Sequence, residues 1–198
     1  MNPLYAKSVI VLANVLMIAI RAPHGRRSRE TPVAKSRKGA MEVVLLKIAL
    51  ATYFLTLVWV ATPFLAFADY PLHPVPFCAG ALCMAIGMWL FRQSHNDLGA
   101  NFSMSLEMRK RHQLVTHGIY RHIRHPMYLA FFVYLTGQSL VLPNWLAGPA
   151  DGVAMLLLFA FRVGPEERMM FEEFGTEYGQ YMAATGRLTP RLRSLRRW

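Results

Sequence analysis

Apolar residues gather in five long blocks along the chain, separated by short polar stretches. The blocks cover residues 3–20, 43–68, 75–91, 127–142 and 145–161. A helix needs roughly 20 apolar residues to cross the hydrocarbon core of a bilayer, with about 17 as a lower bound. Two blocks meet this criterion clearly, and three are marginal alone but suited to a bundle. The pattern predicts an all-α fold: a polytopic membrane helical bundle of about five transmembrane helices, in a single domain over residues 1–198.

The polar breaks between the blocks predict how the helices connect. Pro143-Asn144 is the whole connection between blocks four and five, so residues 127–161 should form an antiparallel helical hairpin. Proline is favoured in the first turn of a helix, so Gly164-Pro165 predicts that a new helix starts after the hairpin. Residues recurring there at a helical spacing predict an amphipathic C-terminal helix: Met170, Phe174, Tyr178 and Tyr181. The basic loop 21–39 is expected to be a flexible surface strap.

The charge distribution predicts how the bundle is oriented. The chain is 54% hydrophobic and 17% charged, with a net charge of +11. Twenty of the 22 Lys and Arg residues lie in three regions that follow blocks one, three and five, and the connections at 69–74 and 143–144 hold none. Five spans place those three regions on one side. The positive-inside rule then makes that side cytoplasmic and the N-terminus external, with the C-terminus in the cytoplasm.

The same features argue against several partners. No recognition motif accompanies the positive charge, so anionic lipid headgroups are expected to face it and nucleic acid is not. No metal is expected, because the histidines at 112–125 have no cysteine or carboxylate at a usual ligand spacing. Cys78 and Cys83 are too far apart in a continuous helix for a disulfide and should pack as small apolar residues.

Two polar clusters flank the predicted hairpin, and they indicate a site. One covers residues 112–128 and the other residues 162–181. Titratable groups at a membrane boundary carry a cost, which makes them candidates for function. Because the hairpin helices are antiparallel, His125 and Glu166 should lie at the same depth. We expect this site on the cytoplasmic side.

The residue types in these clusters suit a small zwitterionic cofactor beside a lipid-soluble partner. Glu166 could pair with an ammonium group, while Tyr120 and Tyr128 could stack on a flat base or face a cation. Arg162 could clamp an anionic acceptor. Simpler interpretations stay open: Glu167 suits a helix N-terminus through the macrodipole, and Tyr128 suits the aromatic belt of a membrane interface. Arg121 and Arg124 also fit the positive-inside pattern.

The order and spacing of these motifs resemble the isoprenylcysteine carboxyl methyltransferase family over roughly residues 90–190. The motifs are His112-x-Leu-Val, Gly118-x-Tyr120, Arg124-His-Pro-x-Tyr128, Arg162-x3-Glu166-Glu167 and Phe174-Gly-x-Glu-Tyr178-x2-Tyr181, preceded by Asp97-Leu-Gly-x-Asn-Phe-Ser103. The resemblance implies a helical membrane bundle that binds S-adenosylmethionine without a Rossmann domain, with residues 90–190 as its cofactor-binding and catalytic portion. The chain has no G-x-G-x-x-G after a strand, which agrees with the expected absence of a Rossmann domain.

The resemblance also assigns residues to roles. It implies cofactor contacts at His112, Gln113, Leu114, Val115, Gly118, Tyr120, His125, Pro126, Met127, Tyr128, Glu166 and Glu167. Arg162 matches the position that the family uses for the acceptor. We expect Arg162, Glu166 and His125 to be the catalytic residues. The family's glutamine seven residues before His-x-Leu-Val is Ser105 here, a departure at one cofactor position.

The implied reaction is methyl transfer from S-adenosylmethionine to a lipophilic acceptor, leaving S-adenosylhomocysteine. Carboxyl O-methylation of an isoprenylcysteine-like substrate is the leading hypothesis. An acceptor carboxylate needs no general base, whereas an amine or thiol would make His125 a candidate base. The alternatives are a phospholipid or amine N-methyltransferase, an NADPH-dependent membrane reductase and a non-enzymatic membrane scaffold. Residues 1–90 carry no signal for the acceptor.

Overall fold

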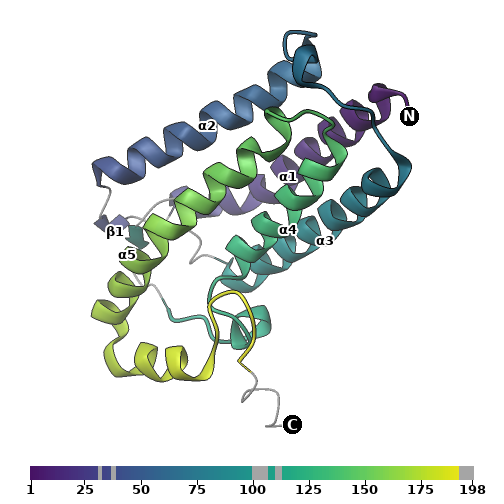
Figure 1. Cartoon of the computed structure of the whole chain (residues 1–198). Helices are drawn as coiled ribbons and strands as arrows, with labels where there is room; N and C mark the ends of the chain where they lie inside the picture. The colour runs from purple at the N-terminus through teal and green to yellow at the C-terminus, as the bar shows by residue number, and fades with distance from the viewer. Residues whose placement is uncertain (31–32, 37–38, 100–106, 110–112, 192–198) are drawn as a thin grey trace.

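The computed structural model describes residues 1–30, 33–36, 39–99, 107–109 and 113–191. Predictions that fall on His112 and Ser105 lie outside these residues. The elements follow the chain in this order: α1 (Pro3–Glu30), β1 (Val33–Ser36), α2 (Ala40–Ala61), η1 (Ala66–Ala68), α3 (Pro74–Leu98), β2 (Glu107–Arg109), η3 (Gly118–Arg121), α4 (Pro126–Val141) and α5 (Ala147–Ala184). Figure 1 shows the helices labelled α1 to α5 lying along one another as a bundle.

The predicted membrane bundle is confirmed. Among the described residues, four helices are long and apolar enough to cross a bilayer, and they include Pro3–His24 of α1. α4 is also apolar but shorter, with 16 residues. Large side chains such as Leu12 and Ile18 are more than half exposed, as expected of surfaces that face lipid. The protein is therefore an integral membrane protein.

The N-terminal part of the loop expected at 21–39 is helical instead. α1 continues to Glu30 with Pro23 inside it. A proline in a helix removes one backbone donor and disturbs one turn, and the described backbone stays helical on both sides of Pro23. After α1, β1 pairs with β2 in an antiparallel two-stranded sheet that aligns Val33 with Arg109. The sequence pattern did not predict this pair, because strands this short carry no clear alternation.

α5 corrects a second boundary. No new helix starts at Gly164-Pro165, and α5 runs through Pro165 as one element of 38 residues. Its break lies at Gly175, where the backbone takes φ 53° and ψ −125°, a conformation that glycine adopts without a Cβ clash. Figure 1 shows the last turns of α5, in yellow, crossing the end of the bundle. The predicted C-terminal helix therefore exists, but it is the end of α5.

α3 and α4 pack closely because glycines lie where they cross. A Cβ built on Gly80 would lie 2.6 Å from the carbonyl oxygen of Gly137, and one on Gly87 would lie 2.7 Å from the backbone nitrogen of Tyr134. Small residues of this kind let membrane helices approach to backbone contact. This packing fixes Tyr134 and the rest of α4 against α3.

The tight connection predicted at Pro143-Asn144 is present, and hydrogen bonds anchor it. Asn144 donates to the carbonyl of Leu65 at 2.8 Å and to the carboxylate of Asp69 at 2.7 Å. The indole of Trp59 donates to the same Asp69 oxygen at 2.7 Å. α4 and α5 therefore run antiparallel from this end, and the start of α4 lies beside the middle of α5 at the other.

Candidate active site

A glycine turn positions the segment that leads into α4. Gly118 has φ 57°, and a Cβ there would overlap the Asp97 carboxylate. That carboxylate accepts the Ile119 N–H at 2.8 Å and the Gln93 amide at 2.9 Å, so the turn is held on the end of α3. Gly118 thus has a structural reason to be glycine, and it serves the site by placing Tyr120.

Tyr120 joins the loop to the end of α5. Its side chain is buried, and burial raises the pKa of its phenol above the ordinary value. Its carbonyl accepts the Tyr181 hydroxyl at 2.6 Å. The backbone N–H groups of Arg124 and His125 donate to the carbonyls of Gly186 and Arg187 at 2.8 and 3.0 Å. The end of the chain therefore braces the segment that carries the His-Pro motif.

Glu167 lies at the centre of a buried ionic cluster. Its Oε1 accepts from Nε of Arg124 at 3.1 Å, and Nε2 of His125 lies 3.3 Å from the same atom. Its Oε2 accepts from Nη2 of Arg187 at 2.6 Å. Arg124 also donates to the backbone carbonyls of Met182 and Thr185. Glu167 raises the pKa of Arg187 above its ordinary value by accepting these hydrogen bonds.

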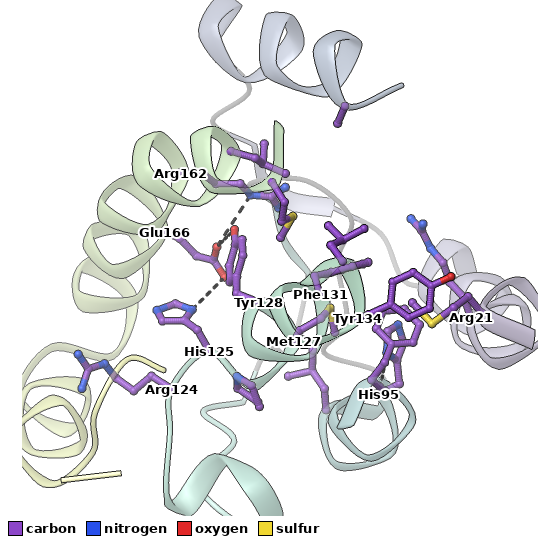
Figure 2. A pocket seen from close by; sticks show the side chains of 18 of the residues that line it. Arg21, His95, Arg124, His125, Met127, Tyr128, Phe131, Tyr134, Arg162 and Glu166 are labelled. Atoms are coloured by element: carbon purple, nitrogen blue, oxygen red, sulfur yellow. Dashed lines mark hydrogen bonds and ion pairs between the residues drawn. The ribbon is translucent and has the colours of Figure 1, made fainter. Parts of the chain in front are cut away.

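Glu166 points to a different environment from Glu167. Tyr128 donates to its Oε2 at 3.0 Å, which brings the end of the first predicted cluster to the start of the second. Nε of Arg162 lies 3.9 Å from the same oxygen, and Nδ1 of His125 lies 4.0 Å from Oε1. Arg162 also lies 3.8 Å from the buried carboxylate of Glu42 on α2. Figure 2 shows Tyr128, His125 and Arg162 turned toward the Glu166 carboxylate.

These side chains line a cavity of about 610 Å³ that reaches from the start of α4 into the bundle. Most of the predicted site residues line it: Gln113, Leu114, Val115, Tyr120, His125, Pro126, Met127, Tyr128, Arg162 and Glu166. Gly118 and Glu167 do not, because Gly118 faces Asp97 and Glu167 faces its arginines. These two residues are placed to position the site, and their cofactor contacts stay predictions.

Sequence reasoning missed the wall that α1 contributes. Asn14, Met17, Ile18 and Arg21 line the cavity at helical spacing, and Arg21 has no carboxylate of the described residues within ion-pair distance. Two signals could have found this wall: a polar Asn14 within an apolar block, and an arginine seven residues later on the same helix face. Within the part of the chain that the structure describes, no three His, Cys, Asp or Glu side chains gather as a metal site.

The arrangement of the described helices around this cavity was compared with solved structures. One solved structure, of the eukaryotic intramembrane Ras methyltransferase isoprenylcysteine carboxyl methyltransferase, superposes with a TM-score of 0.51 and 26% identity. The match covers 76% of this chain and 50% of that chain. The fold therefore defines the class, an all-helical membrane bundle of the methyltransferase type.

The sequence comparisons give the family. The model of the phospholipid methyltransferase family matches residues 75–177, about half of the chain, and the chain belongs to that family. The predicted resemblance to isoprenylcysteine carboxyl methyltransferases is also confirmed. The protein-S-isoprenylcysteine O-methyltransferase of Dictyostelium discoideum is 34% identical over 104 residues, 52% of this chain and 44% of that protein. The enzyme of that name from Tribolium castaneum is 35% identical over 108 residues, which are 53% of this chain and 38% of that protein. The chain spans less than half the length of these two relatives.

Proposed function

We propose that this protein is an S-adenosylmethionine-dependent methyltransferase that methylates a carboxylate on a lipophilic acceptor of the isoprenylcysteine type. The observation that carries the proposal is the hydrogen bond of 3.0 Å between Tyr128 and Glu166 at the wall of a cavity that enters the membrane bundle. It joins the two motifs through which the chain resembles its relatives. The membership of the phospholipid methyltransferase family supports the same reaction class.

The Glu166 carboxylate on the cavity wall suits the cationic part of that cofactor. Glu166 keeps about a third of its side chain exposed, and Oε1 has His125 at 4.0 Å, which is beyond hydrogen-bond distance. This oxygen can therefore accept a charge-assisted hydrogen bond from an ammonium group. The rings of Tyr128 and Tyr120 give flat surfaces for a base or a cation. The cavity volume also lies within the roughly 300–1,000 Å³ of ligand sites.

When bound, the cofactor supplies a sulfonium methyl group, which an acceptor oxygen takes as the carbon–sulfur bond breaks and its electron pair returns to sulfur. The chain's own residues then have to orient the two partners and exclude water. We assign Arg162 to the acceptor carboxylate, which it can reach from its place between Glu42 and Glu166. A carboxylate is already ionised at neutral pH, so His125 needs to remove no proton.

The orientation of the bundle follows from the basic regions. These regions follow α1 and α3 and the membrane-spanning part of α5 in the sequence, and we assign the end of the bundle where α1 and α3 end to the cytoplasm. The cofactor would then enter from the cytosol. The acceptor would enter laterally from the bilayer, where its apolar chain is dissolved.

Calorimetry with the purified protein in detergent tests the proposal. S-adenosylhomocysteine should bind with a saturable 1:1 isotherm and raise the melting temperature, since it binds only the folded state. NADPH should do neither. Methyl-labelled S-adenosylmethionine and N-acetyl-S-farnesylcysteine should then give a labelled methyl ester. A melting shift with NADPH and none with S-adenosylhomocysteine would favour a membrane reductase instead.

A further inference from the structure

The far end of the cavity is polar, although it lies within the membrane bundle. Tyr134 and Gln138 on α4 line this end together with Asp151 on α5. Gln138 follows Tyr128 by ten residues along α4, which corresponds to about 15 Å at the α-helical rise. Polar groups at this depth are costly unless they have partners, which makes them candidates for function.

Asp151 uses one of its two oxygens within the protein. Oδ2 accepts from Thr56 Oγ1 at 2.9 Å and from Gln138 Nε2 at 2.8 Å, and the three side chains are 8%, 0% and 3% exposed. These bonds link α2, α4 and α5. Oδ1 takes no hydrogen bond from any described residue, and the residue borders the cavity. This oxygen therefore keeps its capacity to accept a hydrogen bond, on a residue that lines the cavity.

Tyr134 adds a donor at the same end. Its side chain is 4% exposed, and its hydroxyl has no hydrogen-bond partner among the described residues. Gly87 packs closely against the backbone and Cβ of Tyr134, which fixes the position from which the Tyr134 side chain extends. Figure 2 shows Tyr134 beyond Phe131 as seen from Glu166. The hydroxyl is therefore held at the cavity wall with its hydrogen-bonding capacity unused, an arrangement that native proteins rarely leave unexplained.

Helix association alone does not account for this arrangement. Thr56, Gln138 and Asp151 can join their helices with the two bonds to Oδ2. Neither Oδ1 of Asp151 nor the hydroxyl of Tyr134 takes part in these hydrogen bonds between the helices. An apolar chain end placed here would leave both groups without partners, which costs free energy in a medium without water.

We propose that this end of the cavity binds a hydroxyl group at the far end of the acceptor's apolar chain. A hydroxyl can donate to Oδ1 of Asp151 and accept from Tyr134, whereas an ammonium group can only donate and a ketone can only accept. The proposal rests on the proposed function for the identity of the ligand as the acceptor. It adds that the acceptor is polar at both ends, so an acceptor with an unmodified isoprenoid chain should bind less tightly than one with a terminal hydroxyl.

Direct binding tests this inference without any turnover. The two probes are N-acetyl-S-farnesylcysteine and its derivative with a hydroxyl on the terminal carbon of the chain, titrated by calorimetry into the full-length protein in nanodiscs. The hydroxylated probe should bind about tenfold more tightly or better, because a site built for a hydroxyl discriminates strongly against its absence. Tyr134→Phe should reduce the ratio to about two- or threefold, with the apolar probe binding unchanged.

Two controls make the result decisive. Tyr5→Phe removes the same atom from a side chain that is 59% exposed, and it should keep the full ratio. S-adenosylhomocysteine affinity should be the same in all three proteins, which shows that they are folded. Equal affinities of wild type for the two probes, tighter binding of the apolar probe, or no binding of the hydroxylated one would each overturn the inference. If the wild-type protein did not bind S-adenosylhomocysteine, the proposed function would be overturned instead.

Discussion

Glu166 and Glu167 are neighbours in the chain, and their carboxylates lie in opposite environments. The Glu167 side chain is 6% exposed and has cationic nitrogens of Arg124 and Arg187 at 3.1 and 2.6 Å. The Glu166 side chain is 31% exposed, and the nearest nitrogens of Arg162 and His125 lie at 3.9 and 4.0 Å. Successive residues on an α-helix point about 100° apart, so one turn of α5 can serve two surfaces.

The difference separates a structural carboxylate from one that is available to a ligand. Every short contact of Glu167 is to the protein, and these contacts tie α5 to the start of α4 and to the chain end after α5. Glu166 has one good hydrogen bond, from Tyr128, and its other oxygen faces the cavity. Two glutamates that look equivalent in the sequence should therefore respond very differently to substitution.

The largest effect should come from removing the structural carboxylate. Glu167→Ala leaves the guanidinium of Arg124 buried without its counter-ion, and breaking a buried pair in this way typically costs about 3–5 kcal/mol. We expect a fall in melting temperature of many degrees, measured by fluorescence-detected unfolding in detergent. Glu173→Ala, an exposed glutamate on the same helix, is the matched control and should change the melting temperature little. Equal stability of the two variants would show that the buried cluster contributes nothing.

The next effect should be on binding rather than on stability. Glu166→Gln keeps the shape and removes the charge, so it should weaken S-adenosylhomocysteine binding about 10- to 100-fold, as expected for a hydrogen bond to a charged group of about 1.5–3 kcal/mol. Calorimetry measures this affinity. The melting temperature of the ligand-free variant should stay close to that of wild type. Undiminished affinity would remove Glu166 from the cofactor site.

The sequence predicted the hairpin side of the site better than the rest. The Pro143-Asn144 connection leaves only an antiparallel arrangement, so the meeting of Tyr128 with Glu166 followed from chain order alone. The separate tasks of Glu166 and Glu167 did not follow, because both suit a helix N-terminus. Their difference depends on Arg187, which reaches Glu167 only through the backbone path after α5.

Long-range packing also explains what was missed elsewhere. Arg21 comes to the cavity because α1 packs beside α3 and α4. The boundary at Gly164-Pro165 was wrong because one missing backbone donor does not end a helix that is otherwise well packed. In the sequence, Asp151 and Tyr134 are isolated polar residues in apolar blocks. Only the structure shows that both line the cavity.

A smaller loss of affinity should follow from removing the partner of Glu166. Tyr128→Phe deletes the hydroxyl that donates to Oε2 and keeps the ring, so it removes one hydrogen bond worth about 1 kcal/mol. S-adenosylhomocysteine affinity should fall about fivefold, again measured by calorimetry. In the Glu166→Gln background the same change should cost less, because the two residues act through one contact. Additive effects of the two substitutions would mean that Tyr128 contacts the ligand independently.

The smallest effect should come from the exposed side of the Glu167 cluster. Arg187 makes the shortest contact in the cluster at 2.6 Å, but its side chain is 52% exposed. Solvent screens such a pair, so Arg187→Gln should lower the unfolding free energy by under about 1 kcal/mol, and less at high salt. Arg124→Gln, on the buried side, should cost several times more by the same unfolding measurement, because it removes a buried partner of Glu167. If the two arginines proved equal, exposure would not control the strength of this cluster, and the contrast drawn between Glu166 and Glu167 would have to rest on ligand contacts alone.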